Sequence, residues 1–161
     1  MSMQSLHRLA QTVALSIVFT LVAQAQGSRP SRRPGDPPPP FLNLTLGQSQ
    51  SEIVKMLGAP DVADTLAAGT FSLAWLKRGV SVVVTEREGA AIINATKREA
   101  GTLDGVRVGD THAAVRAQWG EPTKEQGASW LYLLGRWVIA AEFHPQSDRL
   151  VRLGVGWVRG E

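Results

Sequence analysis

Residues that could perform acid–base or nucleophilic chemistry are few in this 161-residue chain. It has three histidines and no cysteine, and His7 precedes an N-terminal apolar segment, which leaves His112 and His144. A zinc site needs three or four converging ligands, most often Cys, His or carboxylate. Two histidines without a cysteine favour structural roles, so we expect no metal, no cofactor and no catalytic residue.

A hydrolytic triad is one alternative. Ser129, His144 and Asp148 have the required residue types. However, nothing like a nucleophile elbow surrounds the serine, and all three belong to one expected strand and a neighbouring turn. We therefore do not assign hydrolysis to them.

Two other patterns could carry chemistry. Asp104, Asp110 and Glu121 could meet near an expected helix, but carboxylates at helix N-termini are commonly caps. Gly154 and Gly156 resemble the start of a phosphate-binding loop, yet they lie in an expected terminal strand with no helix after it. Neither pattern supports a reaction.

Five tryptophans and one tyrosine are better candidates for binding another molecule. Trp75 and Trp119 are expected in the core. A core position is also the first interpretation for the other tryptophans, and an exposed binding surface is the functional alternative. Aromatic residues on the uncovered face of a sheet would serve as binding anchors. The predicted partner-binding residues are Tyr132, Arg136, Trp137, Arg152 and Trp157.

A 15-residue stretch that occurs twice, at residues 46–60 and 108–122, must position these side chains. Its two glycines and its proline are displaced by the same 62 positions (109 − 47, 120 − 58, 122 − 60). Ser49 and Glu52 form a capping box at the start of a short helix, and Thr111 caps the second copy. A glycine and a proline end each helix.

Alternating apolar residues predict antiparallel strands around each helix. The fold class is α+β, with two tandem repeats, each a short helix packed on a three- to four-stranded antiparallel sheet. Whether the two sheets are separate or shared stays open. The expected strands are residues 41–46, 70–77, 80–87, 90–96, 129–134, 137–143 and 149–158, and residues 61–69 and 123–128 are expected loops.

The chain divides into four segments. Residues 1–25 have the apolar core and the Ala-Gln-Ala site of a secretory signal peptide, and a membrane anchor is the competing interpretation. Residues 26–40 are a Pro- and Arg-rich linker, residues 41–100 the first repeat and residues 101–158 the second. The predicted location is periplasmic or secreted, after cleavage near Ala25 and Gln26.

The linker has three interpretations. It is first a spacer, because consecutive prolines hold the backbone extended. It could also be a ligand for an aromatic groove, or make weak contact with an anionic membrane surface through Arg29, Arg32 and Arg33. The net charge of +3 comes without a basic stripe, so we expect no nucleic-acid partner.

The capped helix, its glycine and proline, and the aromatic strands after it resemble the SmpA/OmlA (BamE-like) family. In tandem form they are also similar to the β-lactamase inhibitor proteins. The resemblance covers about residues 42–157 and implies an exported protein that binds other proteins or wall components. The matching residues are Gly47, Ser49, Val54, Leu57, Gly58, Pro60 and Trp75, and then Gly109, Thr111, Val115, Trp119, Gly120, Pro122, Trp130 and Tyr132.

The leading hypothesis is therefore an exported, non-enzymatic protein-binding module of the bacterial cell envelope. Its partner would be another protein or an envelope component, bound on the sheet. One alternative is an enzyme inhibitor that inserts the loop at residues 61–69 or 123–128 into a partner's active site. The other is a small-ligand-binding or hydrolytic protein, which would need a pocket with convergent polar groups.

Overall fold

The computed structural model describes residues 36–158. The expected signal peptide, its cleavage site and the linker residues Arg29, Arg32 and Arg33 lie outside this described part. Within residues 36–158, no helix is long and apolar enough to cross a membrane.

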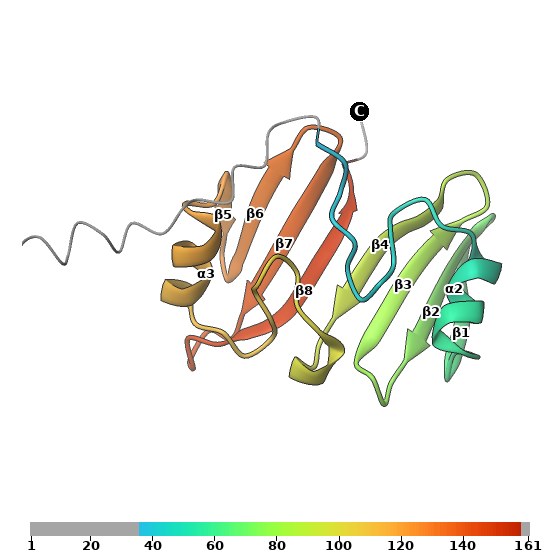
Figure 1. Ribbon diagram of the computed structural model, residues 1–161, viewed down its shortest axis with the longest axis horizontal. Coiled ribbons are helices and arrows are strands. Elements are labelled where there is room, and N and C mark those ends of the chain that lie inside the picture. Colours follow the sequence, from blue (N-terminus) through green and yellow to red (C-terminus); the bar gives the residue numbers. More distant parts are fainter. Residues whose placement is uncertain (1–35, 159–161) are drawn as a thin grey trace, which may run out of the picture. The chain divides into compact units, whose positions relative to one another are not determined.

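The described chain contains two short α-helices, one 3₁₀ turn and eight strands (Figure 1). In chain order they are α2 (Gln50–Leu57), β1 (Val62–Ala67), β2 (Thr70–Trp75), β3 (Val80–Thr85), β4 (Gly89–Ala95), η1 (Arg98–Ala100), α3 (His112–Trp119), β5 (Lys124–Gln126), β6 (Ser129–Leu134), β7 (Trp137–Phe143) and β8 (Leu150–Trp157).

All eight strands belong to one antiparallel sheet in the order β1-β2-β3-β4-β8-β7-β6-β5. The predicted fold class, two tandem repeats that are each a short helix packed on a three- to four-stranded antiparallel sheet, is therefore wrong, and the open question of separate or shared sheets is decided for one shared sheet. The physical reason is the pairing of β4 with β8, which joins the strands of both halves edge to edge. The protein is mainly this sheet, and the helices are eight residues each.

Both predicted helices are confirmed, together with their caps. Ser49 accepts a hydrogen bond from the backbone N–H of Glu52, whose side chain accepts from Ser49 in return, so the capping box is complete. Thr111 accepts from the N–H of Ala114 at the start of α3. Each helix ends at a glycine with positive φ. These ends depend on local sequence, which is why the sequence predicts them.

Three segments differ from the sequence prediction. Residues 41–46 form no strand, because Leu42 and Asn43 have positive φ and close a tight turn between Phe41 and Leu44. The expected loops at residues 61–69 and 123–128 contain the edge strands β1 and β5. All their strand residues are exposed, so they lack the apolar alternation that indicates a strand.

The two halves meet along four residue pairs of β4 and β8, from Ile92 opposite Gly156 to Ala95 opposite Leu153. Beyond the first pair, Ala90 of β4 exchanges hydrogen bonds with the segment before α2 (Gly47 N–H to Ala90 O, 2.9 Å, and Ala90 N–H to Gln48 O, 2.7 Å). The strands β4 and β8 therefore separate at this end of the sheet.

We call the β4–β8 pairing the seam. At its other end, the segment before α3 pairs with β8 in the same way as the segment before α2 pairs with β4. Gly109 N–H donates to Leu150 O (2.7 Å), and Leu150 N–H donates to Asp110 O (2.8 Å). Each helix is thus tied by its preceding backbone to the last strand of a half. Because both ties lie on the seam, it fixes the helices as well as the strands.

One face of the sheet carries the core. The helices cover its two sides, and the tight turns at Phe41–Leu44 and Leu103–Val106 lie between them over the middle (Figure 1). The side chains of these four turn residues are 0–1% exposed. At about 25 cal/mol per Å² of apolar surface, such complete burial makes the two turns major contributors to the core.

The end of the predicted linker also packs on the sheet. Pro39 is buried, and the carbonyl oxygen of Asp36 accepts a hydrogen bond from the indole N–H of Trp137 (2.8 Å). The segment at residues 36–40 is therefore part of the fold, and its role as a simple spacer is corrected for these residues.

Gly89 tests the tie between β4 and the segment before α2. Its φ is +69°, and a Cβ there would lie 2.6 Å from the backbone oxygen of Gln48. We expect Gly89→Ala to destabilise the fold by about 2–4 kcal/mol, since strain and collision with backbone add. Gly127→Ala is the matched control, because Gly127 also has positive φ (+57°) but nothing within 4 Å of its Cβ position.

The control should cost only about 1–2 kcal/mol, from backbone strain alone. Chemical denaturation of the two variants measures both values. Equal losses of stability would contradict the close contact between Gly89 and the backbone of Gly47 and Gln48.

Candidate functional site

The five residues predicted to bind a partner do not form one surface. Tyr132 and Trp137 are 7% and 2% exposed, so they lie in the core and are not exposed aromatic anchors. Arg136 and Arg152 are exposed, and Trp157 is half-buried. Whether any of the five contacts a partner stays a prediction.

The buried aromatic side chains have partners that explain their orientation. The Tyr132 hydroxyl donates to the carbonyl oxygen of Gly120 at the end of α3 (3.2 Å), and the Trp75 indole N–H donates to Gly58 O at the end of α2 (3.1 Å). Burial raises the pKa of Tyr132 to about 12. Helix ends leave carbonyls without intrahelical partners, so these aromatic donors satisfy backbone groups while they fill the core.

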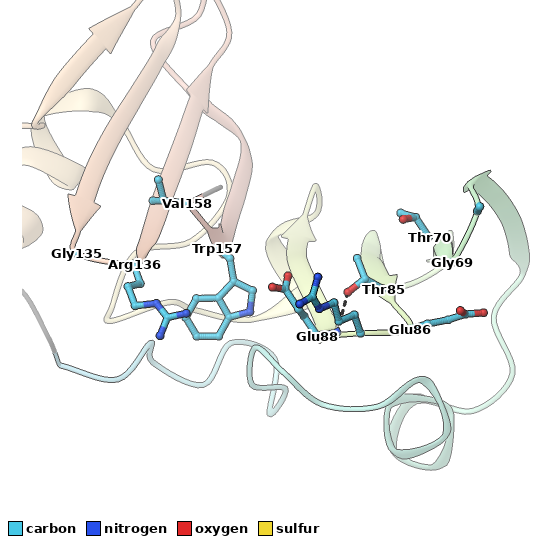
Figure 2. Close-up of a pocket in the computed structure, with 11 residues that line it drawn as sticks. Gly69, Thr70, Thr85, Glu86, Glu88, Gly135, Arg136, Trp157 and Val158 are labelled. Carbon is cyan, nitrogen blue, oxygen red and sulfur yellow. Dashed lines mark hydrogen bonds between the residues drawn. The ribbon is translucent and has the colours of Figure 1, made fainter. Parts of the chain in front are cut away.

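Arg136 and Trp157 instead line a hollow of about 1000 Å³ at the end of the sheet where β4 and β8 separate. Figure 2 shows Arg136, Trp157 and Val158 on one side, and Thr85, Glu86 and Glu88 on the other, with Gly69 and Thr70 beyond them. The full lining is Ala68, Gly69, Thr70, Thr85, Glu86, Arg87, Glu88, Gly135, Arg136, Trp157 and Val158.

The turns around the hollow are held by hydrogen bonds. In the turn between β3 and β4, Glu88 N–H donates to the Thr85 hydroxyl (3.0 Å) and Glu86 N–H donates to Gly69 O (2.9 Å). On the opposite side, Val158 N–H donates to Arg136 O (2.8 Å). The backbone of the hollow is thus organised before any ligand binds, which lowers the ordering cost of binding.

Four charged side chains line the hollow together with the half-buried indole of Trp157. They are Glu86, Arg87, Glu88 and Arg136, two of each sign, and within residues 36–158 none of them belongs to an ion pair. An aromatic surface with charged groups of both signs suits a polypeptide segment, because Trp and Arg are the residue types that most often anchor protein interfaces. We call this hollow, with the eleven lining residues given above, the Trp157 hollow.

Arg152 lies elsewhere, on the face of the sheet opposite the helices, which we call the open face. It is directly opposite Glu142 on the neighbouring strand and forms an ion pair with it (3.1 Å). The sequence grouped Arg152 with Arg136 and Trp157, but the structure separates them.

The histidine contacts were missed by sequence analysis. His112, the first residue of α3, donates from Nδ1 to the carboxylate of Asp148 in the turn between β7 and β8. The imidazole stacks on Phe143 at a centroid distance of 3.6 Å and contacts the edge of Trp130 at 4.7 Å. This hydrogen bond lowers the pKa of Asp148 below its ordinary value. No local pattern joins residues 36 positions apart, so the sequence offered no signal for this pair.

The structure does not assemble the triad of Ser129, His144 and Asp148. Asp148 pairs with His112, while Nδ1 of His144 accepts from the N–H of Gln146 (3.2 Å). The His112–Asp148 pair and His144 line one shallow hollow of about 450 Å³. The His112–Asp148 hydrogen bond links the start of α3 to the β7–β8 turn, and we call this link the tether.

Of the three carboxylates considered for acid–base chemistry, Asp110 and Glu121 remain apart. Asp110 precedes the cap of α3 and Glu121 follows its end, so a helix of about 12 Å separates them. Asp110 lies 3.6 Å from Arg98, and Glu121 pairs with Arg116 at 2.9 Å. Within residues 36–158, no group of three or more His, Asp or Glu residues is placed to hold a metal ion.

Asp148 predicts a specific pH dependence of stability. Because its pKa is lower in the folded chain, it stabilises the fold fully above its unfolded pKa of about 4, and this contribution is lost as pH falls through the folded pKa. Asp148→Asn removes this dependence. We expect the Tm of the parent chain to fall more steeply between about pH 5 and pH 3 than that of the variant.

Glu99→Gln is the control, since the Glu99 side chain is exposed and has no hydrogen bond or ion pair within residues 36–158. Calorimetry across this pH range measures all three proteins. Parallel Tm curves for the parent chain and Asp148→Asn would show that the tether does not stabilise the fold.

Comparison with known proteins gives similarity of fold. An extracellular protein with an SCP domain from Bacillus anthracis superposes with a TM-score of 0.60 at 11% identity, covering 80% of this chain and 49% of that one. A cysteine-rich secretory protein from Staphylococcus aureus gives 0.59 at 14% identity, with 78% and 48% covered. This chain thus spans about half the length of both.

A DUF4309 family protein from Bacillus subtilis superposes with a TM-score of 0.50 at 14% identity, covering 83% of this chain and 90% of that one. At these identities the likeness shows the fold alone. No protein-family model and no curated protein sequence matches this chain. None of the three structures is described as an SmpA/OmlA protein, so that resemblance stays a prediction.

Proposed function

We propose that this chain is an exported, non-enzymatic module that binds another protein through the Trp157 hollow. The observation that carries the proposal is the convergence of Arg136 and Trp157, two of the residues predicted from sequence to contact a partner, on one preorganised site. The site is wide and lined by charged side chains, unlike the enclosed, mostly apolar pockets that hold small molecules.

The partner that fits is an extended protein segment with an apolar side chain and flanking charges. Its apolar side chain would contact the exposed part of the Trp157 indole, while Glu86, Glu88, Arg87 and Arg136 offer both signs of charge. Charges at the rim of such a site govern specificity and association rate. Export is supported by the signal-peptide pattern of residues 1–25, and two structures of similar fold are described as extracellular or secretory.

Site-specific photo-crosslinking tests this proposal. A photo-reactive residue at position 136, beside Trp157, should give one discrete adduct with an envelope or secreted protein in cells that produce the chain. The same residue at exposed Lys55 on α2 should not. With the captured protein purified, Arg136→Glu should raise Kd about tenfold or more, because it reverses a charge at the rim of the site.

Arg78→Glu is the matched control. Arg78 is also an exposed turn arginine, but it lies between β2 and β3, at the other end of these strands from the hollow. Identical adducts from positions 136 and 55, or an equal effect of Arg78→Glu and Arg136→Glu, would contradict binding at the hollow.

A further inference from the structure

Two rows of residues on the open face contain no charged side chain, which the fold itself does not require. The ion pair of Glu142 and Arg152 lies on the same face, next to these rows. The side chains of this face alternate with the buried ones, and an antiparallel sheet with one solvated face normally carries polar residues there. The two rows cross six strands from β2 to β6. The first is Ser72, Val83, Ile92, Gly156, Val138 and Leu133, and the second is Ala74, Ser81, Asn94, Gly154, Ala140 and Leu131.

Several of these side chains are large, aliphatic and in contact with solvent. Ile92 and Leu133 are 40% and 45% exposed, and Val83, Val138 and Leu131 are partly exposed. Contiguous exposed apolar surface of this kind marks interaction sites in soluble proteins. The open face is therefore a second candidate interface, on a different side of the sheet from the buried aromatic residues.

We propose that a second copy of this chain covers the open face, with the two sheets packed face to face about a two-fold axis parallel to the β4–β8 seam. The strand order places equal numbers of strands on each side of the seam. The rotation therefore lays β4 over β8, β3 over β7, β2 over β6 and β1 over β5 of the second copy, and it keeps each row over the same row. Such isologous contacts are the commonest in homo-oligomers.

This superposition sets large side chains over small ones. In the first row Ile92 meets Gly156 of the second copy, and Leu133 meets Ser72. In the second row Leu131 meets Ala74 in the same way. Large residues opposite small ones let two sheets interdigitate at the usual separation of about 10 Å. The rows are thus complementary to themselves under one symmetry operation.

The charged residues on the two edge strands are also complementary under this rotation. Asp64 on β1 is level with the first row and Lys124 on β5 with the second, so the edges of the face carry opposite charges. Because the rotation lays β1 over β5, each Asp64 comes near Lys124 of the second copy, and the contact occurs twice. Opposite charges placed around an apolar centre fix the register of an interface.

The size of the face also fits a dimer. Eight strands about 4.8 Å apart, with strands of about six residues at 3.3 Å each, give a face of roughly 38 by 20 Å, or about 760 Å². Stable interfaces bury about 800 Å² on each partner. The whole face, edges included, is therefore large enough for a specific dimer.

Analytical ultracentrifugation of the purified chain tests the proposal. We expect a monomer–dimer equilibrium in which Asp64→Lys or Lys124→Asp alone raises Kd about tenfold, since each creates two like-charge contacts at exposed positions. The double variant Asp64→Lys with Lys124→Asp should restore the parent Kd. High salt should reduce the effect of the single reversals.

Leu133→Glu should raise Kd more than about a hundredfold, because it places an unpaired charge in the first apolar row. Its matched control is Met56→Glu, since Met56 is also 45% exposed but lies on α2, which packs on the opposite face of the sheet. Arg136→Glu, which tests the hollow, should leave this dimer unchanged, so the two proposals fail separately. A monomer at every concentration up to the solubility limit, or a dimer that the double variant does not restore, would overturn the inference.

Discussion

The antiparallel pairing of β4 with β8 is the contact on which the rest of the structure depends. Only four residue pairs make it, and both strands continue past the pairing at one end. The pairing turns eight strands into one sheet, and the backbone before each helix attaches to the seam at Ala90 and Leu150. Without it, each half would have a small core and an exposed strand edge, which is a site of uncontrolled pairing.

Two glycines of β8 make this close pairing compatible with the open face. A Cβ at Gly154 would collide with the side-chain amide of Asn94, and one at Gly156 would lie 3.2 Å from the backbone oxygen of Ala91 and 3.3 Å from the Ile92 side chain. The side chains of β4 therefore lean over β8. The sequence analysis considered these glycines as the start of a phosphate-binding loop and rejected that interpretation. In the structure they allow close packing of β4 on β8.

The divergence of the same two strands produces the Trp157 hollow. The register ends at Ile92 and Gly156, so Trp157 extends beyond the pairing while β4 turns to the segment before α2. One constraint thus accounts for three features: the continuous core beneath the sheet, the continuous open face above it and the hollow at its end. The surfaces proposed for a partner and for a second copy are both consequences of the seam.

Sequence predicted what local interactions decide. The helices at residues 50–57 and 112–119 follow from capping residues and terminal glycines, and the central strands follow from alternating apolar residues. The edge strands β1 and β5 were not predicted, because their residues are all exposed and show no alternation of apolar and polar side chains. The pairing of β4 with β8 was not predicted, because the sequence does not show which strands pair with each other.

The sequence also could not predict which aromatic side chains face the core. Alternation groups Trp130 with Tyr132, and Trp137 with Ile139, but does not say which group faces the core. The structure decides this through distant hydrogen bonds, since Tyr132 and Trp137 donate to carbonyls of Gly120 and Asp36. Of the predicted site, Arg136 and Trp157 came together because two strand ends happen to meet at the hollow.

Equilibrium unfolding followed by ¹⁹F NMR of 5-fluorotryptophan tests the seam most directly. Trp75 reports on the first half of the sheet, and Trp130 and Trp137 report on the second. If the β4–β8 pairing makes one cooperative unit, all these signals will change at the same denaturant concentration with the same slope. A Trp75 signal that unfolds at a different midpoint from Trp130 and Trp137 would show two independent halves and contradict the account.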